Sequence, residues 1–592
     1  MNLKLRFVAL LLVVVMCLAA CDIFVSNSEN QTTTSTTVTT KKTTNTTTTK
    51  STTTKSSTTK TTTTKVTTPK LPVNEFDPAS NSVSYDELVS RYDLTTEEVD
   101  ATSALLDEML TLAMDPNANL DEIEELFDEY DAKFTHIVQQ ATISMIIYYY
   151  NMVDEVASER YLAAMDIVYG LEDEYNQMLK TMYLESPHSA ELFEGWTEEE
   201  LKSLEEYDPT VMQLQKDIDA LQVQYDQLTG KEANYNDLCV DIYKQLIIKG
   251  NQLARLNKYD NYYDYASDNI YERDYEREDL AAFREYIVEY VVPYALSLLA
   301  EYRAHAGWTS STKKLRVEEF LDKEFYLSPN RNYVSAYLNS LGDTTMGNGM
   351  RHVFENRNCM FSFSEKSHPT AFQTYLYEDD NPFCFFGSKG QSANTVIHEI
   401  GHYYAAITNG DLDNYDLCET HSQGNEFLFL TFAETYMSED VYGAVEAYNL
   451  VNACFTIIIA TIVDEFEQRL YVLDDETINN MTTEDFDNVM ASVCEAYGGT
   501  SWVNKLTNPY SYWRAVCISS PVYYISYAVS ASAAINIYAL AQEDYDAAIL
   551  AYTTLVEGVT EADGFLGALE KAGLTTPFDE ETFISIEGVL AN

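Results

Sequence analysis

Two histidines four residues apart, with a glutamate directly after the first, could bind a metal ion and activate water. They are His398, Glu399 and His402 in the stretch TVIHEIGHYY. The segment 392–407 has no proline, and its Ser-Ala-Asn start can cap a helix. On a helix, both imidazoles would lie on one face and could reach the same cation. Glu399 lies one step round the helix and could take a proton from a water on that cation without being a ligand.

A glycine stands between these histidines at position 401, where a helix would normally avoid it. Glycine in a helix interior costs about 1 kcal/mol relative to alanine. Such a residue is expected where another element must approach closely, which includes active sites. If no second element completed the site, the two histidines would only share one turn of an ordinary helix.

A catalytic zinc site needs a third protein ligand, and the next helix-like run downstream offers several. This run, CETHSQGNEFLFLTFAETY, contains the candidates Glu419, His421, Glu426 and Glu434. Because carboxylates and imidazoles both bind zinc, the side-chain types alone leave the choice open.

The order HEIGH, then Glu419-x-x-Ser422-Gln423-x-x-Glu426, resembles the thimet oligopeptidase and oligoendopeptidase F family of zinc peptidases. In that family, a second helix supplies a ligand glutamate, followed by a serine, often a glutamine, and another acidic residue. The resemblance implies that Glu419 is the third ligand of one Zn²⁺ ion and that Glu426 supports an imidazole ligand. The gap between His402 and Glu419 is shorter than is usual in the family, which leaves Glu426 as an alternative ligand.

Other stretches carry the same resemblance. The segments at 324–342 and 364–386 are similar to family segments that enter the catalytic half and border the substrate. The stretch YYISYAVSASAA is similar to a tyrosine-rich helix whose tyrosines face the scissile carbonyl in the family. This implies Tyr527 or Tyr524 as hydrogen-bond donors to the transition state, with Tyr523 close by. The family also has a histidine just before this helix, whereas here Cys517 stands near that position.

The resemblance implies both a reaction and a fold. The reaction would be hydrolysis of peptide bonds in short, unfolded oligopeptides, with Glu399 activating a zinc-bound water. The fold would be mainly α-helical, with two helical lobes around a deep substrate channel and a small β element beside the HExxH motif. Two other interpretations stay open: a catalytically impaired, peptide-binding surface lipoprotein that retains the peptidase fold, and a surface adhesin.

The hydrophobic pattern along the chain predicts the elements that would position these residues. From about residue 84 to 305, apolar residues recur at three- and four-residue steps, which predicts helices. Residues 355–390 alternate aromatic and polar side chains and predict a few short strands, after which helices resume. We therefore divide the body into an N-terminal helical region, 76–320, and a catalytic zinc peptidase region, 321–592.

The first 20 residues have the pattern of an export signal. Lys4 and Arg6 form a basic head, and an apolar run then leads to the sequence LAAC. This ending resembles a bacterial lipoprotein box, which implies that residues 1–20 are removed and that Cys21 is lipidated. No later stretch is expected to be long and apolar enough to span a bilayer.

Residues 21–75 predict a disordered stalk. Between positions 31 and 70 the chain has 24 threonines and 7 lysines, and such a segment cannot bury a core. The mature protein would thus be tethered by its lipid to the extracellular face of the cell membrane.

The charge of the body excludes one class of partner. Residues 71–592 hold 28 lysines and arginines against 92 aspartates and glutamates, so we expect no nucleic-acid partner. The seven cysteines after Cys21 are scattered, with no CxxC pair, which argues against a disulfide framework or a structural zinc site. We expect most of them to be buried as small apolar residues.

Overall fold

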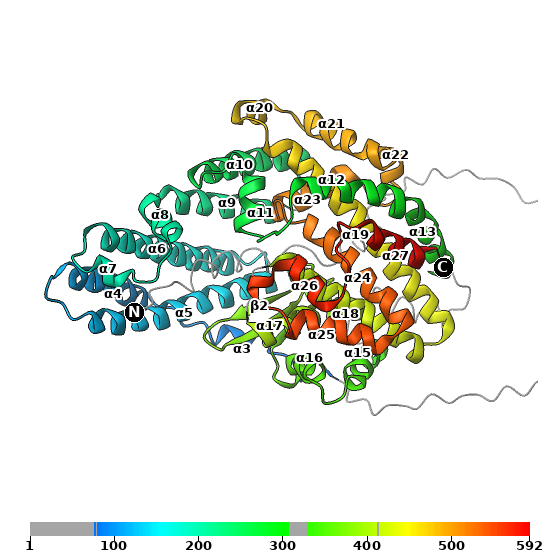
Figure 1. Cartoon of the computed structure of the whole chain (residues 1–592), viewed down its shortest axis with the longest axis horizontal. Coiled ribbons are helices and arrows are strands. Elements are labelled where there is room, and N and C mark those ends of the chain that lie inside the picture. Colours follow the sequence, from blue (N-terminus) through cyan, green and yellow to red (C-terminus); the bar gives the residue numbers. More distant parts are fainter. Residues whose placement is uncertain (1–75, 78–79, 229, 307–327, 411–413, 592) are drawn as a thin grey trace, which may run out of the picture.

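Two helical lobes meet across a small β-sheet in the computed structural model (Figure 1). The structure describes residues 76–77, 80–228, 230–306, 328–410 and 414–591. The predicted signal peptide, Cys21, the predicted stalk and the predicted boundary at 320/321 lie outside these residues. The mainly α-helical fold with a small β element that the sequence predicted is confirmed.

The smaller lobe contains the helices coloured from blue to cyan in Figure 1. Its elements are α3 (Tyr85–Val89), α4 (Thr96–Met114), α5 (Leu120–Tyr150), α6 (Glu155–Glu185), α7 (Ser189–Leu192) and α8 (Glu198–Glu206). Every residue of α5 from Ile137 to Tyr149 is buried, because this part of the helix packs against α4, α6 and the sheet. A helix that is buried on all sides forms the centre of a core, so α5 organises this lobe.

The larger lobe contains the remaining helices. They are α9 (Thr210–Asp226), α10 (Tyr235–Leu256), α11 (Tyr262–Asn269), α12 (Arg277–Tyr286), the π-helical turn η1 (Ile287–Val291), α13 (Val292–Ala306), α15 (Ser328–Ser340), α16 (Thr345–Glu355), α17 (Ala393–Asn409), α18 (Tyr415–Tyr436), α19 (Glu439–Tyr471), α20 (Asp475–Asn480), α21 (Thr483–Cys494), η2 (Glu495–Tyr497), α22 (Thr500–Val503), α23 (Pro509–Ser519), α24 (Ile525–Glu543), α25 (Tyr545–Glu557), η3 (Glu561–Asp563), α26 (Gly564–Ala572) and α27 (Glu580–Leu590).

The three-stranded sheet lies between the two cores. Its strands are β1 (Cys359–Phe361), β2 (Ala371–Leu376) and β3 (Asn381–Phe386), in the order β1-β3-β2, with β1 parallel and β2 antiparallel to β3. On β3, Phe383 and Phe385 belong to the core of the smaller lobe, whereas Cys384 and Phe386 belong to the core of the larger one. Because successive side chains on a strand point to opposite faces, one short strand joins both cores. The strands predicted within 355–390 are confirmed.

Helix α19 is the one described helix that is long and apolar enough to cross a membrane, judged by length and composition. The expectation that no such stretch follows the signal segment is therefore wrong on those two criteria. However, 83% of its apolar window is buried inside the protein. The helix is apolar because it packs against α13, α24 and several neighbours in the core of the larger lobe.

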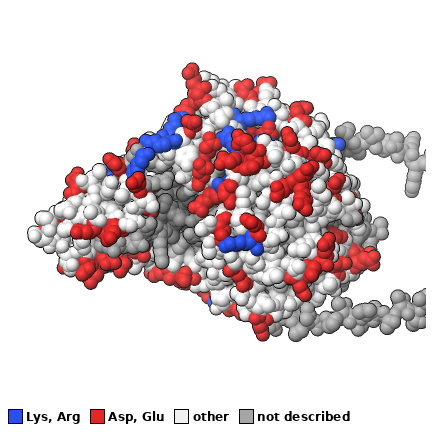
Figure 2. Space-filling view, viewed as in Figure 1, with Lys and Arg blue, Asp and Glu red and all other residues white. Residues whose placement is uncertain are grey.

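The surface in Figure 2 carries many acidic side chains and few lysines or arginines, as the composition predicts. Six of the seven described cysteines are buried, which confirms the expectation for most of them; Cys418 is partly exposed.

Candidate metal centre

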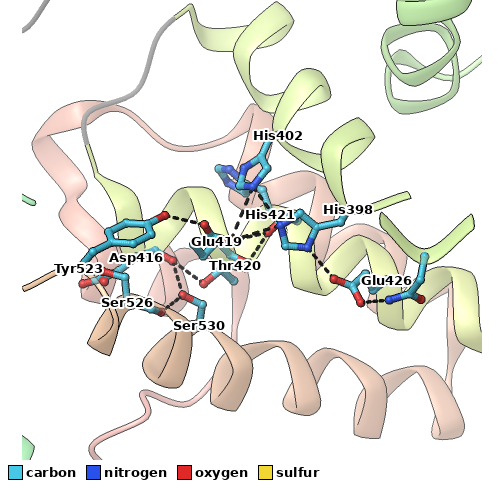
Figure 3. Close-up of polar contacts among 12 residues, drawn as sticks. His398, His402, Asp416, Glu419, Thr420, His421, Glu426, Tyr523, Ser526 and Ser530 are labelled. Carbon is cyan, nitrogen blue, oxygen red and sulfur yellow. Dashed lines mark hydrogen bonds and ion pairs between the residues drawn. The ribbon is translucent and has the colours of Figure 1, made fainter. Parts of the chain in front are cut away.

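His398 and His402 on α17 and Glu419 on α18 point toward a common position (Figure 3). The two imidazole Nε2 atoms are 3.2 Å apart, and Oε2 of Glu419 lies 3.4 Å from Nε2 of His398 and 3.6 Å from Nε2 of His402. A tetrahedral zinc ion with bonds of about 2.0–2.1 Å holds its ligand atoms about 3.4 Å apart. The three donor atoms therefore fit a single zinc ion.

Helices α17 and α18 can approach this closely because position 401 is a glycine. A Cβ atom there would lie 2.7 Å from the carbonyl oxygen of His421 and 2.8 Å from Cα of Ser422, both on α18. Backbone atoms cannot move aside as a flexible side chain can, so any larger residue would push the helices apart. The close approach that the glycine indicated in the sequence is confirmed.

Hydrogen bonds fix the position of α17 relative to α18. Ser392 caps α17 by accepting a hydrogen bond from the backbone N–H of Thr395 at 3.1 Å. The amide of Asn425 on α18 donates to the carbonyl oxygen of Ile397 at 2.7 Å, and Tyr337 on α15 donates to the same asparagine at 2.7 Å. The residue directly before His398 is thus tied to the helix that carries Glu419.

Glu426 determines which nitrogen of His398 faces the common position. Its Oε1 lies 2.6 Å from Nδ1 of His398, and its Oε2 accepts a hydrogen bond from the amide of Asn394. Because a carboxylate only accepts, the proton of a neutral His398 resides on Nδ1, and Nε2 presents a lone pair. The structure thus brings Glu419 to the common position and places Glu426 on the opposite side of the imidazole.

The charges in this group suit a cation. Burial raises the pKa of Glu419, but the neighbouring imidazoles and the Tyr523 hydroxyl outweigh burial and hold the pKa below its usual value. Burial lowers the pKa of His402 to about 3, so its imidazole is neutral near pH 7. A carboxylate and neutral imidazoles are the protonation states that bind zinc.

Tyr523 and Ser422 orient the carboxylate of Glu419. The Tyr523 hydroxyl donates to Oε1 at 2.6 Å, and the Ser422 hydroxyl donates to Oε2 at 3.0 Å (Figure 3). From the sequence, Tyr523 is expected only as a close neighbour of Tyr527 and Tyr524. The rings of these three tyrosines pack edge to face, with Tyr527 5.1 Å from Tyr523 and 5.4 Å from Tyr524. The Tyr524 hydroxyl forms a hydrogen bond with Tyr512.

The backbone before Tyr523 is held in an unusual conformation. Val522 has a φ of 65°, and a β-branched residue in this left-handed region is strained by roughly 1–3 kcal/mol. Both carboxylate oxygens of Glu467 accept from the Val522 N–H at 3.1 Å, and Arg273 donates to the Val522 carbonyl oxygen at 2.7 Å. These two buried side chains, which sequence reasoning missed, stabilise the strained turn and thereby position Tyr523.

Glu399 is buried on α17 directly after His398, with 1% of its surface exposed. Its backbone carbonyl accepts a hydrogen bond from the thiol of Cys384 at 3.7 Å. Burial raises the pKa of that thiol, and the carboxylate of Glu399 raises it further. The candidate base therefore lies beside the central strand β3.

The other candidates lie elsewhere. Nε2 of His421 interacts with the carbonyl of Leu555 at 3.1 Å, and Glu434 is exposed near the end of α18. Cys517 is buried, and its thiol interacts with Tyr243 and Glu467. None of these three side chains belongs to the group formed by His398, His402 and Glu419.

The fold is similar to that of several solved peptidase structures. A structure of PZ peptidase A with an inhibitor has a TM-score of 0.64 and 18% identity, covering 86% of this chain and 99% of that chain. One assigned as an oligoendopeptidase F has a TM-score of 0.63 and 18% identity, covering 86% and 98%. Another so assigned, from Bacillus anthracis str. Ames, has a TM-score of 0.57 and 17% identity, covering 84% and 95%.

This chain has the two-lobed helical fold of these peptidases. No protein-family model matches it, and no curated protein matches it in sequence. At such low identities the likeness concerns the fold, and the chemistry must be argued from the residues of the site.

Replacing Gly401 by alanine should separate α17 from α18 and so weaken zinc binding and lower the unfolding temperature. We expect a loss of about 1–3 kcal/mol in the free energy of unfolding, typical of overpacking. Gly170 in α6 is a matched control, because nothing lies within 4 Å of a Cβ added there. Thermal unfolding and bound zinc, measured on both variants, test this; a Gly401→Ala protein that keeps its zinc and stability would contradict it.

Replacing Glu426 by glutamine should lower zinc affinity about tenfold or more. A neutral amide accepts from Nδ1 of His398 more weakly than a carboxylate does, and such supporting contacts tune the basicity of the ligand. Competition with a chromogenic zinc chelator measures the effect. Glu434→Gln, an exposed change on the same helix, should leave the affinity unchanged. Equal affinities for both variants would rule out the supporting role.

Proposed function

We propose that this protein is a zinc-dependent peptidase that hydrolyses short, unfolded oligopeptides. The observation that carries the proposal is the convergence of His398, His402 and Glu419 on one position, with Glu399 next in the chain to the first ligand. The similarity in fold to PZ peptidase A supports it.

The reaction assigns a role to each of these residues. When bound by the three ligands, Zn²⁺ supplies Lewis-acid chemistry, which polarises a carbonyl and makes water a better nucleophile. Glu399 accepts the proton of the attacking water and passes it to the leaving amine. The hydroxyl of Tyr527 or Tyr524 donates a hydrogen bond to the developing oxyanion. Tyr523 and Ser422 keep the carboxylate of Glu419 turned toward the histidines.

We further propose that the enzyme acts outside the cell. This rests on the export signal, on the LAAC sequence ending at Cys21 and on the threonine-rich segment that follows. Lipidation of Cys21 would tether the enzyme to the outer face of the membrane, with the stalk as a spacer.

A peptide-binding surface lipoprotein with impaired catalysis is the second candidate. It is favoured by Cys517, which stands near the position where the resembling peptidases have a histidine and is buried against Tyr243. Under this alternative, the purified protein would bind zinc and peptides but would release no cleavage products.

Turnover of the unchanged protein separates the two candidates, and replacing Glu399 by glutamine tests the role of this residue. The variant should retain one zinc per chain, because Glu399 is not a ligand, and lose at least a hundredfold in kcat, because general base catalysis contributes about 10²–10⁴-fold. Elemental analysis gives the zinc content, and an internally quenched peptide with mass spectrometry of the products gives the turnover.

Two further results complete this test. Chelation should abolish cleavage by the unchanged protein, and added zinc should restore it. Glu434→Gln controls for the loss of one carboxylate from the same region. Equal turnover in the Glu399→Gln variant would refute the role of this residue, and zinc binding without any cleavage would favour the second candidate.

A further inference from the structure

A cavity of about 160 Å³ lies between helices of the two lobes. Its walls come mainly from α6 in the smaller lobe and α9 in the larger lobe, which pack together, and from His368 and Ser519. In Figure 1, α6 and α9 lie next to each other at the junction of the lobes.

Two chain segments connect this cavity to the metal centre. Ser519 is the last residue of α23 and stands four residues before Tyr523, whose hydroxyl donates a hydrogen bond to Glu419. His368 precedes β2, and its N–H donates to the carbonyl of Tyr149 at 2.7 Å. Strand β2 in turn packs against α17, which carries both histidines. The cavity and the metal centre are thus joined by two short segments of the chain.

The cavity has excess negative charge. Asp219 and Asp226 lie seven residues apart, two turns of α9, and both line it. The one lysine in its wall, Lys216, is paired with Asp166 at 2.7 Å. Burial lowers the pKa of His368 to about 4, so this histidine adds no positive charge near pH 7.

The two aspartates lack a cation among the described residues. Asp219 accepts hydrogen bonds from the hydroxyl of Tyr169 and from the amide of Gln215, and no described residue forms a hydrogen bond with the carboxylate of Asp226. Burial raises the pKa of Asp219 to about 6 and that of Asp226 to about 7. A carboxylate in such a place is stabilised as an anion only when a positive partner arrives.

Two buried tyrosines face the same space. Tyr149 and Tyr161 line the cavity, are 4% and 5% exposed, and form no side-chain hydrogen bond with any described residue. Burial raises the pKa of both hydroxyls, and the charges of Asp219 and Asp226, which line the same cavity, raise it further. Aromatic rings combined with carboxylates bind organic cations through cation–π attraction and charge-assisted hydrogen bonds.

We propose that this cavity binds a positively charged group of the oligopeptide substrate against Asp219 and Asp226. The group is either the N-terminal ammonium or the side chain of a lysine or arginine. A cavity of about 160 Å³ is large enough for a small cationic group. This inference rests on the proposed peptidase function, because it names the peptides that the enzyme prefers.

The test uses quenched peptides that differ in one charge. One series carries lysine or norleucine at successive positions on either side of the cleaved bond, and each peptide is made with a free and with an acetylated N-terminus. We expect kcat/KM of the unchanged protein to be at least tenfold higher for one cationic placement than for its neutral match. If the effect of lysine survives acetylation, the bound group is the lysine side chain. If acetylation removes the effect, the bound group is the N-terminal ammonium.

Variants test whether the preference for charged peptides arises in the cavity. Asp226→Asn and the double variant with Asp219→Asn should lose the preference for the charged peptide and keep kcat/KM for the neutral one. Asp217→Asn removes a negative charge from the same helix but from the side that faces Lys249, 2.6 Å away, and should keep the preference. The melting temperature of the Asp226→Asn variant should not fall, because no described residue pairs with this carboxylate and the substitution therefore breaks no ion pair.

The outcomes are distinguishable from failure of the proposed function. The inference is overturned if charged and neutral peptides are cleaved equally well, or if Asp226→Asn and the double variant keep the preference. In either case, cleavage of the neutral peptides still supports the proposed peptidase function. If no peptide is cleaved, fluorescence anisotropy measures how tightly the purified protein binds the same charged and neutral peptides. A charge preference that the aspartate variants abolish supports the cavity, and its absence overturns it.

Discussion

The close packing of α17 against α18 is the constraint on which the candidate site depends. Two imidazoles can be brought to one side of a helix by sequence spacing alone, but Glu419 reaches them only because Gly401 has no side chain to keep α18 away. The cost of glycine in a helix, about 1 kcal/mol, is therefore offset by an arrangement that no other residue permits at this position.

Two of the three donor side chains of the site, His398 and Glu419, are fixed by partners outside it. Glu426 holds His398, and Tyr523 and Ser422 hold Glu419. The support continues outward, because Arg273 and Glu467 hold the left-handed backbone just before Tyr523. Backbone strain of roughly 1–3 kcal/mol persists only where several surrounding contacts fix the conformation. Here such strain lies one residue from a group that orients a candidate ligand.

The sequence predicted the local features of this molecule and missed the distant ones. The His398–His402 spacing, the strands within 355–390 and the role of glycine at 401 follow from periodicity and residue type, so they can be read without a structure. The choice between Glu419 and Glu426 needed either a resemblance or the structure, since both lie on one helix. Arg273 and Glu467 could not be found, because they are 249 and 55 residues from Val522 and no local pattern marks them.

The sheet determines how the metal centre and the acidic cavity are placed relative to each other. Strand β3 contributes Phe383 and Phe385 to one core and Cys384 and Phe386 to the other, so the lobes cannot shift independently without exposing one of these faces. The metal centre lies on the larger lobe beside this strand, and α6 of the smaller lobe forms a wall of the cavity. A peptide bound at both places would have to match the fixed distance between them. The protein would then select substrates by the position of their charge.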